Sequence, residues 1–203
     1  LVQGRDTLSG CTHTVLPDRI EAATYLAAGA VTGGAVTVKC DPGHLAAPIA
    51  VLRRMGCKIK ITGGSVALTA PEKLCGAGSI VTLPYPGFPT DLQAVFMAAA
   101  AGAKGYTAFT ETVFPRRWAH VEELRRMGAD ITVAGSHAML RGAALTGTAL
   151  TCTDLRAGAA VVLAALAARG ESTVTGLSHI ERGYAEFVLT LRHLGAEITI
   201  AEI

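Results

Sequence analysis

The sequence predicts an α/β fold built from three copies of one β-α-β-α-β-β unit around a pseudo-threefold axis. A first landmark, which combines Leu, two basic residues, an apolar residue and Gly, recurs about every 70 residues. It occurs as LRRMGCKI from Leu52, LRRMGADI from Leu124 and LRHLGAEI from Leu191. A second landmark, an Asp after a β-rich run, keeps step with the first at Asp18, Asp91 and Asp154. Two landmarks in step indicate true repeats, which we place at about 12–70, 79–142 and 148–203.

Each unit begins with a strand that leads into a helix of small apolar residues. The strands are predicted over 12–16, 79–84 and 148–153. The Asp that follows each strand suits a helix N-cap, because its carboxylate accepts hydrogen bonds from the unpaired N–H groups of the first turn. The helices are predicted over 20–31, 92–101 and 155–168, and glycine ends each of them.

A second strand and a second helix follow in each unit. The strands are predicted over 36–39, 106–111 and 172–175. The second helix carries the Leu-Arg landmark and directs its basic residues, Arg125 and Arg126 among them, to solvent. A strand with alternating apolar residues closes the unit, and the first two copies add another strand over 65–69 and 138–141. The third copy stops at Ile203 before that last strand, so either it folds without one or another part of a longer protein supplies it.

The first helix of each unit is apolar on nearly every face, as in LRAGAAVVLAALAA over 155–168. A helix that is hydrophobic all round must be buried on all sides. We therefore expect the three apolar helices to bury one another in the middle, with the sheets outside them. This arrangement also brings three helix N-termini to corresponding positions, where the helix dipoles favour an anion.

Composition excludes several classes of protein. Half of the 203 residues are apolar, 17% are charged and the net charge is +2, which indicates neither a nucleic-acid partner nor a membrane surface. The longest apolar run, 157–168, is too short to span a bilayer. Five cysteines without CxxC spacing or a Cys/His cluster predict no metal site and a reducing, cytoplasmic location. Because the chain begins with Leu rather than Met, we expect a fragment of a longer protein.

Six runs, taken together and in this order, resemble the enolpyruvyl transferase family. They are PDRIEAATYLAAGAVTGG (17–34), GFPTDLQAVFM (87–97), TETVF (110–114), HVEELRRMGADI (120–131), TDLRAGAAVVLAAL (153–166) and HIERGY (179–184). The domains of this family are inside-out α/β barrels of three such repeats. The runs are similar to the branch that uses UDP-N-acetylglucosamine, and the shikimate branch would show an RxKExxR-like run that is missing near HIERGY.

The resemblance implies that residues 1–203 form one enolpyruvyl transferase domain, the C-terminal domain of two. The implied activity transfers enolpyruvyl from phosphoenolpyruvate to the 3-hydroxyl of UDP-N-acetylglucosamine, the first committed step of peptidoglycan synthesis. It implies no cofactor, no nucleic acid and no membrane. The implied partners are the two small-molecule substrates and the missing N-terminal domain of the same protein, which bears the reactive cysteine. The chain alone is therefore expected to be inactive.

The resemblance also assigns roles to five residues. Asp91 in FPTDLQ matches the carboxylate that hydrogen-bonds the 3-hydroxyl and is proposed as the base. Val113 in TETVF matches a backbone position that contacts the UDP-sugar. Arg117 in FPRRWAHV and Arg156 in TDLRA match residues that face the phosphoenolpyruvate carboxylate. Arg182 in HIERGY matches one near the phosphate, and with Asp91 it is the predicted catalytic pair.

Each assignment has an ordinary structural alternative. Asp91 could simply cap a helix, as expected for its counterparts in the other two copies, and Val113 could be an interior strand residue. The arginines could be solvated surface residues. Pro115 departs from the acidic-Asn pair expected before Arg117 and makes the placement of that arginine less certain. For the whole chain, the alternatives are a free-standing UDP-sugar-binding module without catalysis and a shikimate-pathway enolpyruvyl transferase.

Overall fold

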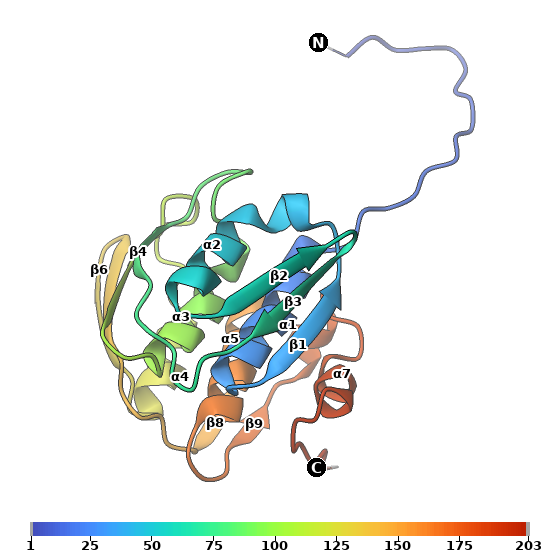
Figure 1. Ribbon diagram of the computed structural model, residues 1–203. Helices are drawn as coiled ribbons and strands as arrows, with labels where there is room; N and C mark the ends of the chain where they lie inside the picture. Colours follow the sequence, from blue (N-terminus) through green and yellow to red (C-terminus); the bar gives the residue numbers. More distant parts are fainter. Residues whose placement is uncertain (1, 202–203) are drawn as a thin grey trace.

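Three apolar helices lie side by side in the middle of the computed structural model, which describes residues 2–201 (Figure 1). They are α1 (Arg19–Val31), α3 (Gln93–Ala101) and α5 (Leu155–Ala167). All three contact one another, and every residue of α3 is buried. The prediction of buried central helices is therefore confirmed. The predicted end of the third repeat at Ile203 lies outside the described residues.

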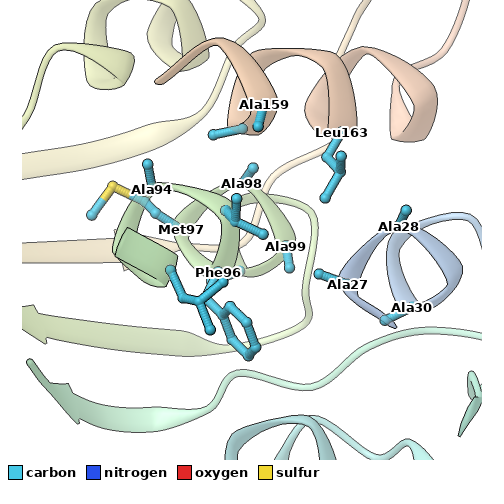
Figure 2. Packing of buried hydrophobic residues seen from close by; sticks show 14 of the residues in the cluster. Ala27, Ala28, Ala30, Ala94, Phe96, Met97, Ala98, Ala99, Ala159 and Leu163 are labelled. Atoms are coloured by element: carbon cyan, nitrogen blue, oxygen red, sulfur yellow. The ribbon is translucent and has the colours of Figure 1, made fainter. Parts of the chain in front are cut away.

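Small side chains let these helices approach closely. Figure 2 shows Ala27 of α1 and Ala99 of α3 facing the space between their helices. Leu163 points from α5 into the same region and is fully buried, with 0% of its surface exposed. Because protein interiors are packed as tightly as organic crystals, this region has little room for a larger or a charged side chain.

The middle repeat forms the one complete sheet among the described residues. Its strands are β4 (Gly78–Val81), β5 (Tyr106–Thr110), β6 (Asp130–Ala134) and β7 (His137–Arg141). The spatial order is β4-β5-β7-β6, so the fourth strand of the unit lies between the second and the third. β4 pairs with β5 in parallel, whereas β7 is antiparallel to both of its neighbours. The sheets lie outside the central helices, as predicted (Figure 1).

The other two sheets are partial versions of this pattern. In the first repeat the strands are β1 (Ala35–Lys39), β2 (Lys58–Thr62) and β3 (Ser65–Thr69), in the order β1-β3-β2. In the third repeat, two strands are paired within the described residues, β8 (Ala149–Thr151) and β9 (Thr173–Thr175), in parallel. Each of these sheets therefore matches part of the order of the middle sheet.

Two predicted strands are wrong. Residues 12–16 form no strand, and the segment runs away from the body of the molecule with Val15 82% exposed (Figure 1). Its sequence has strand propensity, but propensity does not guarantee a neighbour to pair with. The alternating strand predicted to close each unit also does not form in the third copy over residues 196–200. In the complete unit the third strand pairs only with the fourth, so this segment has no partner when the fourth is not present among residues 2–201.

The second helices of the units lie at the periphery, and two of them connect neighbouring repeats. They are α2 (Ala46–Arg54), α4 (His120–Arg126) and α7 (Phe187–His193). Arg54 donates from Nε and Nη2 to the carbonyl oxygens of Ala77 and Ser79 in the next repeat. Glu123 likewise accepts a hydrogen bond from the N–H of Thr151. The landmark helices α2 and α4 therefore also join neighbouring repeats, whereas the sequence predicted only that their basic residues face solvent.

The remaining helical segments are short. They are the 3-10 turns η1 (Pro42–Leu45) and η2 (Thr90–Leu92) and the single-turn helix α6 (Ser178–Glu181). Among the described residues, no helix combines the length and apolar character needed to cross a membrane.

Candidate active site

The three landmark aspartates differ in how their carboxylates are used. Asp18 and Asp154 cap α1 and α5 as predicted, each accepting two hydrogen bonds from N–H groups of the first turn. Asp91 does not cap α3. It lies inside the 3-10 turn η2, whose N-cap residue is Pro89, and its side chain makes no capping bond. The capping alternative for Asp91 is therefore wrong, because the extra turn moves its carboxylate off the helix end.

The Asp91 carboxylate is instead bound by two guanidinium groups. Its Oδ1 lies 2.8 Å from Nη1 of Arg117, and its Oδ2 lies 3.2 Å from Nη2 of Arg156. Arg117 comes from the loop after β5, and Arg156 comes from the first turn of α5. The structure thus brings three of the five predicted site residues into contact, from two different repeats. The Asp91 side chain is 37% exposed, so a ligand can reach the cluster.

A buried tyrosine holds Arg156 from the other side. Nη1 of Arg156 donates to the hydroxyl of Tyr184 over 3.2 Å, and the guanidinium lies over the tyrosine ring at 5.6 Å. The same hydroxyl is hydrogen-bonded to Thr24 of α1 at 2.9 Å. Burial raises the pKa of the Tyr184 phenol, so the group stays a neutral hydroxyl. Through Thr24, the first repeat also supports this arginine.

Arg117 is anchored within its own repeat. Its Nη1 donates to Thr90 Oγ1 over 3.1 Å as well as to Asp91, and its guanidinium lies 5.4 Å from the Phe114 ring centroid. The preceding residue, Arg116, has a left-handed backbone with φ of 74°. That turn follows Pro115 and reverses the loop toward the cluster, so the departure from the family pattern still leaves Arg117 beside Asp91.

The loop that carries Val113 is tied to a buried glutamate. Val113 lies beyond the end of β5, so the alternative of an interior strand residue is wrong. Its N–H donates to Glu111 Oε1 over 2.9 Å. Sequence reasoning missed Glu111, Thr90 and Tyr184. A charged residue at the end of a strand whose alternate residues are buried is a signal for Glu111, but nothing in the sequence shows which donors surround it.

Arg182 is not joined to the cluster. It follows α6 as its C-cap residue, it is exposed, and its side chain makes no hydrogen bond or ion pair with another residue of 2–201. It stands two residues before Tyr184, which contacts Arg156. Its predicted place near a phosphate therefore stays a prediction.

His120 is the first residue of α4, directly after the loop that carries Arg117. It is buried, and its Nε2 lies 3.1 Å from Sδ of Met97 in α3. Burial lowers the pKa of His120 from 6.5 to about 4; the Asp154 charge opposes this effect, and the Arg117 charge adds to it. The imidazole is therefore neutral near pH 7.

Solved structures with the same arrangement identify the fold. The enolpyruvyl transferase NikO from Streptomyces tendae superimposes with a TM-score of 0.82 at 30% identity, over 92% of this chain and 45% of that one. An EPSP synthase from Acinetobacter baumannii superimposes with a TM-score of 0.67 at 20% identity, which shows the fold alone. The fold is the inside-out α/β domain of enolpyruvyl transferases.

Residues 1–191 match the family model described as EPSP synthase (3-phosphoshikimate 1-carboxyvinyltransferase), so the chain belongs to this family. It is 47% identical to the UDP-N-acetylglucosamine 1-carboxyvinyltransferase of Finegoldia magna, over 100% of this chain and 48% of the relative. It is also 47% identical to UDP-N-acetylglucosamine 1-carboxyvinyltransferase 1 of Symbiobacterium thermophilum, over 98% of this chain and 45% of the relative. The chain spans about half the length of the curated relatives it matches.

Proposed function

We propose that this chain is part of an enzyme that transfers enolpyruvyl from phosphoenolpyruvate to the 3-hydroxyl of UDP-N-acetylglucosamine. The observation that carries the proposal is the Asp91 carboxylate held between Arg117 and Arg156. The cluster combines a candidate base with two cations arranged for a carboxylate, and relatives at 47% identity bear the name of this activity. Such a reaction would serve peptidoglycan synthesis.

The two arginines already bind a carboxylate in the structure, that of Asp91. Guanidinium groups suit this task because they present paired donors and stay charged. We propose that the carboxylate of phosphoenolpyruvate takes the place of Asp91 between Arg117 and Arg156. This exchange releases the Asp91 carboxylate from its two counter-charges and leaves it free to accept a proton.

The freed Asp91 would act on the sugar. As its carboxylate takes the proton from the 3-hydroxyl, the sugar oxygen forms a bond to C2 of phosphoenolpyruvate and C3 gains a proton. The C2–O bond to phosphate then breaks and C3 loses a proton, which restores the double bond. Val113 would contact the UDP-sugar through its backbone, and we keep Arg182 as the proposed contact to the departing phosphate.

The proposed partner is the missing N-terminal domain of the same protein, which is consistent with relatives about twice as long as this chain. The third repeat supports this idea, since in the middle sheet the fourth strand of the unit pairs with the second, whereas within residues 2–201 β9 pairs only with β8. A strand from elsewhere in a longer protein would fill that place. The five cysteines are all unpaired in the structure, and we propose a reducing, cytoplasmic location.

The test is turnover by the full-length protein that contains this chain. Phosphate release from phosphoenolpyruvate should depend on UDP-N-acetylglucosamine, and the product should carry one added enolpyruvyl group by mass. Release with shikimate 3-phosphate instead would favour the shikimate branch. Tight binding of UDP-N-acetylglucosamine without turnover would favour a binding module. The chain alone should remain at background, because it supplies only about half of the length of its relatives.

A further inference from the structure

Glu111 is a buried carboxylate next to the proposed site. It follows the last residue of β5, and none of its surface is exposed. It forms no ion pair with any Lys, Arg or His within residues 2–201. A buried carboxylate is costly unless hydrogen bonds replace its lost hydration. Its hydrogen-bond partners therefore explain why the fold tolerates it.

Four donors from three segments converge on this carboxylate. Oε1 accepts from the Thr82 hydroxyl at 2.8 Å and from the N–H groups of Val113 at 2.9 Å and Phe114 at 3.0 Å. Oε2 accepts from the Thr90 hydroxyl at 2.9 Å. A carboxylate is the side-chain group that can accept from so many donors at once. Glu111 thus joins the end of β4, the turn η2 and the loop after β5.

Two of the three segments carry the proposed site. Thr90 precedes Asp91 in the chain, and its Oγ1 accepts a hydrogen bond from Arg117 at 3.1 Å while donating to Glu111. The loop held by the Val113 and Phe114 amides leads directly to Arg117. A continuous chain of bonds therefore runs from Glu111 through Thr90 to Arg117 and on to Asp91.

We propose that Glu111 is a positioning residue for the enolpyruvyl transfer, which sets where Arg117 and Asp91 stand relative to each other and to the Val113 backbone. This inference rests on the proposed function. Glu111 itself is buried, so it acts through Thr90 and the loop and does not touch substrate. When phosphoenolpyruvate displaces Asp91, the hydrogen bond that Arg117 donates to Thr90 keeps Arg117 in place.

The test uses Glu111→Gln in the full-length protein. An amide at the place of Oε2 donates and cannot accept the Thr90 hydroxyl proton, so Thr90 then faces two donors and its hold on Arg117 weakens. We expect the KM for phosphoenolpyruvate to rise about tenfold and kcat to fall up to about 100-fold, since small misplacements carry large rate costs. Hydrogen exchange of residues 112–118 should speed up, while exchange of α1, α3 and α5 stays unchanged.

Thr90 provides a second variant if Glu111→Gln does not fold. Thr90→Val removes the hydroxyl at nearly constant volume and should reproduce the kinetic loss, whereas Thr90→Ser keeps the hydroxyl and should recover most of it. Glu122→Gln, an exposed change on α4, is the matched control and should behave as wild type.

The outcomes separate this inference from the proposed function. Unchanged exchange of the 112–118 segment, or a loosened segment with wild-type KM and kcat, would overturn the role of Glu111. Equal losses in Thr90→Ser and Thr90→Val would overturn it as well. A wild-type protein without enolpyruvyl transfer would defeat the proposed function, and with it the catalytic purpose of Glu111, while the exchange rates would still decide whether Glu111 holds the loop.

Discussion

At the scale of single residues, the three landmark aspartates offer an internal comparison. They occupy the same place in three copies, yet Asp18 and Asp154 bind backbone N–H groups and Asp91 binds two arginines. The sequence shows the equivalence but not the difference, because it does not reveal the 3-10 turn that begins α3. The chemistry proposed for Asp91 can therefore be tested against two residues of identical type.

The prediction is that Asp91→Asn alone abolishes most turnover of the full-length protein. Asn caps a helix nearly as well as Asp, so Asp18→Asn and Asp154→Asn should lower the melting temperature only slightly and keep turnover. Asn cannot take the proton from the sugar hydroxyl, and loss of a general base costs about two to four orders of magnitude in rate. Turnover, melting temperature and affinity for phosphoenolpyruvate should be measured side by side.

The affinity for phosphoenolpyruvate also tests whether the substrate carboxylate replaces the Asp91 carboxylate between the two arginines. If Asp91 competes with the substrate carboxylate for the two arginines, Asp91→Asn should bind phosphoenolpyruvate at least as tightly as the wild type. Equal and mild effects of all three Asn variants on turnover would instead remove Asp91 from the chemistry and leave only the arginines.

His120 predicts how the stability of the fold depends on pH. Its folded-state pKa is lowered from 6.5 to about 4, so between these values the unfolded chain binds more protons than the folded chain. Stability is therefore fully present above pH 6.5 and declines as the pH falls through this window. We expect His120 to contribute a loss of about 2 kcal/mol between pH 7.5 and pH 5.

Thermal unfolding at the two pH values tests this contribution. His120→Gln should lower stability near pH 7, because it disturbs a buried contact with Met97, but it should also flatten the decline toward pH 5. His193→Gln, at an exposed position, is the control and should keep the wild-type slope. A wild-type slope in His120→Gln would show that this histidine is not buried in its neutral form.

At the scale of elements, the sequence determines the helices better than the strands. The all-apolar segments allow only a buried position, and the three central helices lie within one residue of their predicted bounds. A strand instead depends on a partner that local sequence does not specify, which is why 12–16 and 196–200 were predicted wrongly. The same limit applies to the site. The family motifs contain Glu111 and Tyr184 as well as Asp91 and Arg156, but the sequence indicates no role for the first two, because their partners include residues of distant segments.

The central helices are tested by paired substitutions. Leu163→Asp places a carboxylate without a partner among close-packed alanines and should cost several kcal/mol. Arg126→Asp, on the peripheral helix α4 where the side chain is half exposed, should cost about 1 kcal/mol or less. Similar melting temperatures for the two variants would contradict the central position of α5.

At the scale of the whole molecule, each repeat contributes one part of the site. Thr24 comes from the first repeat, Asp91 from the second and Arg156 from the third, and Tyr184 connects the first of these to the last. The links through Arg54 and Glu123 hold neighbouring repeats in register. A site assembled in this way depends on the packing of all three units, and none of them holds it alone.

The 3-10 turn before α3 has a consequence for the ancestry of such a molecule. When one unit is copied twice, every copy inherits the same acidic residue. At its inherited position, this residue caps the N-terminus of a helix. In the second copy the helical path has its N-cap at Pro89, two residues before Asp91, so the acid no longer caps the helix although it is unchanged in type. One copy can therefore acquire a new role through a change in its backbone path, while the aspartates of the other two copies keep the inherited role of helix cap.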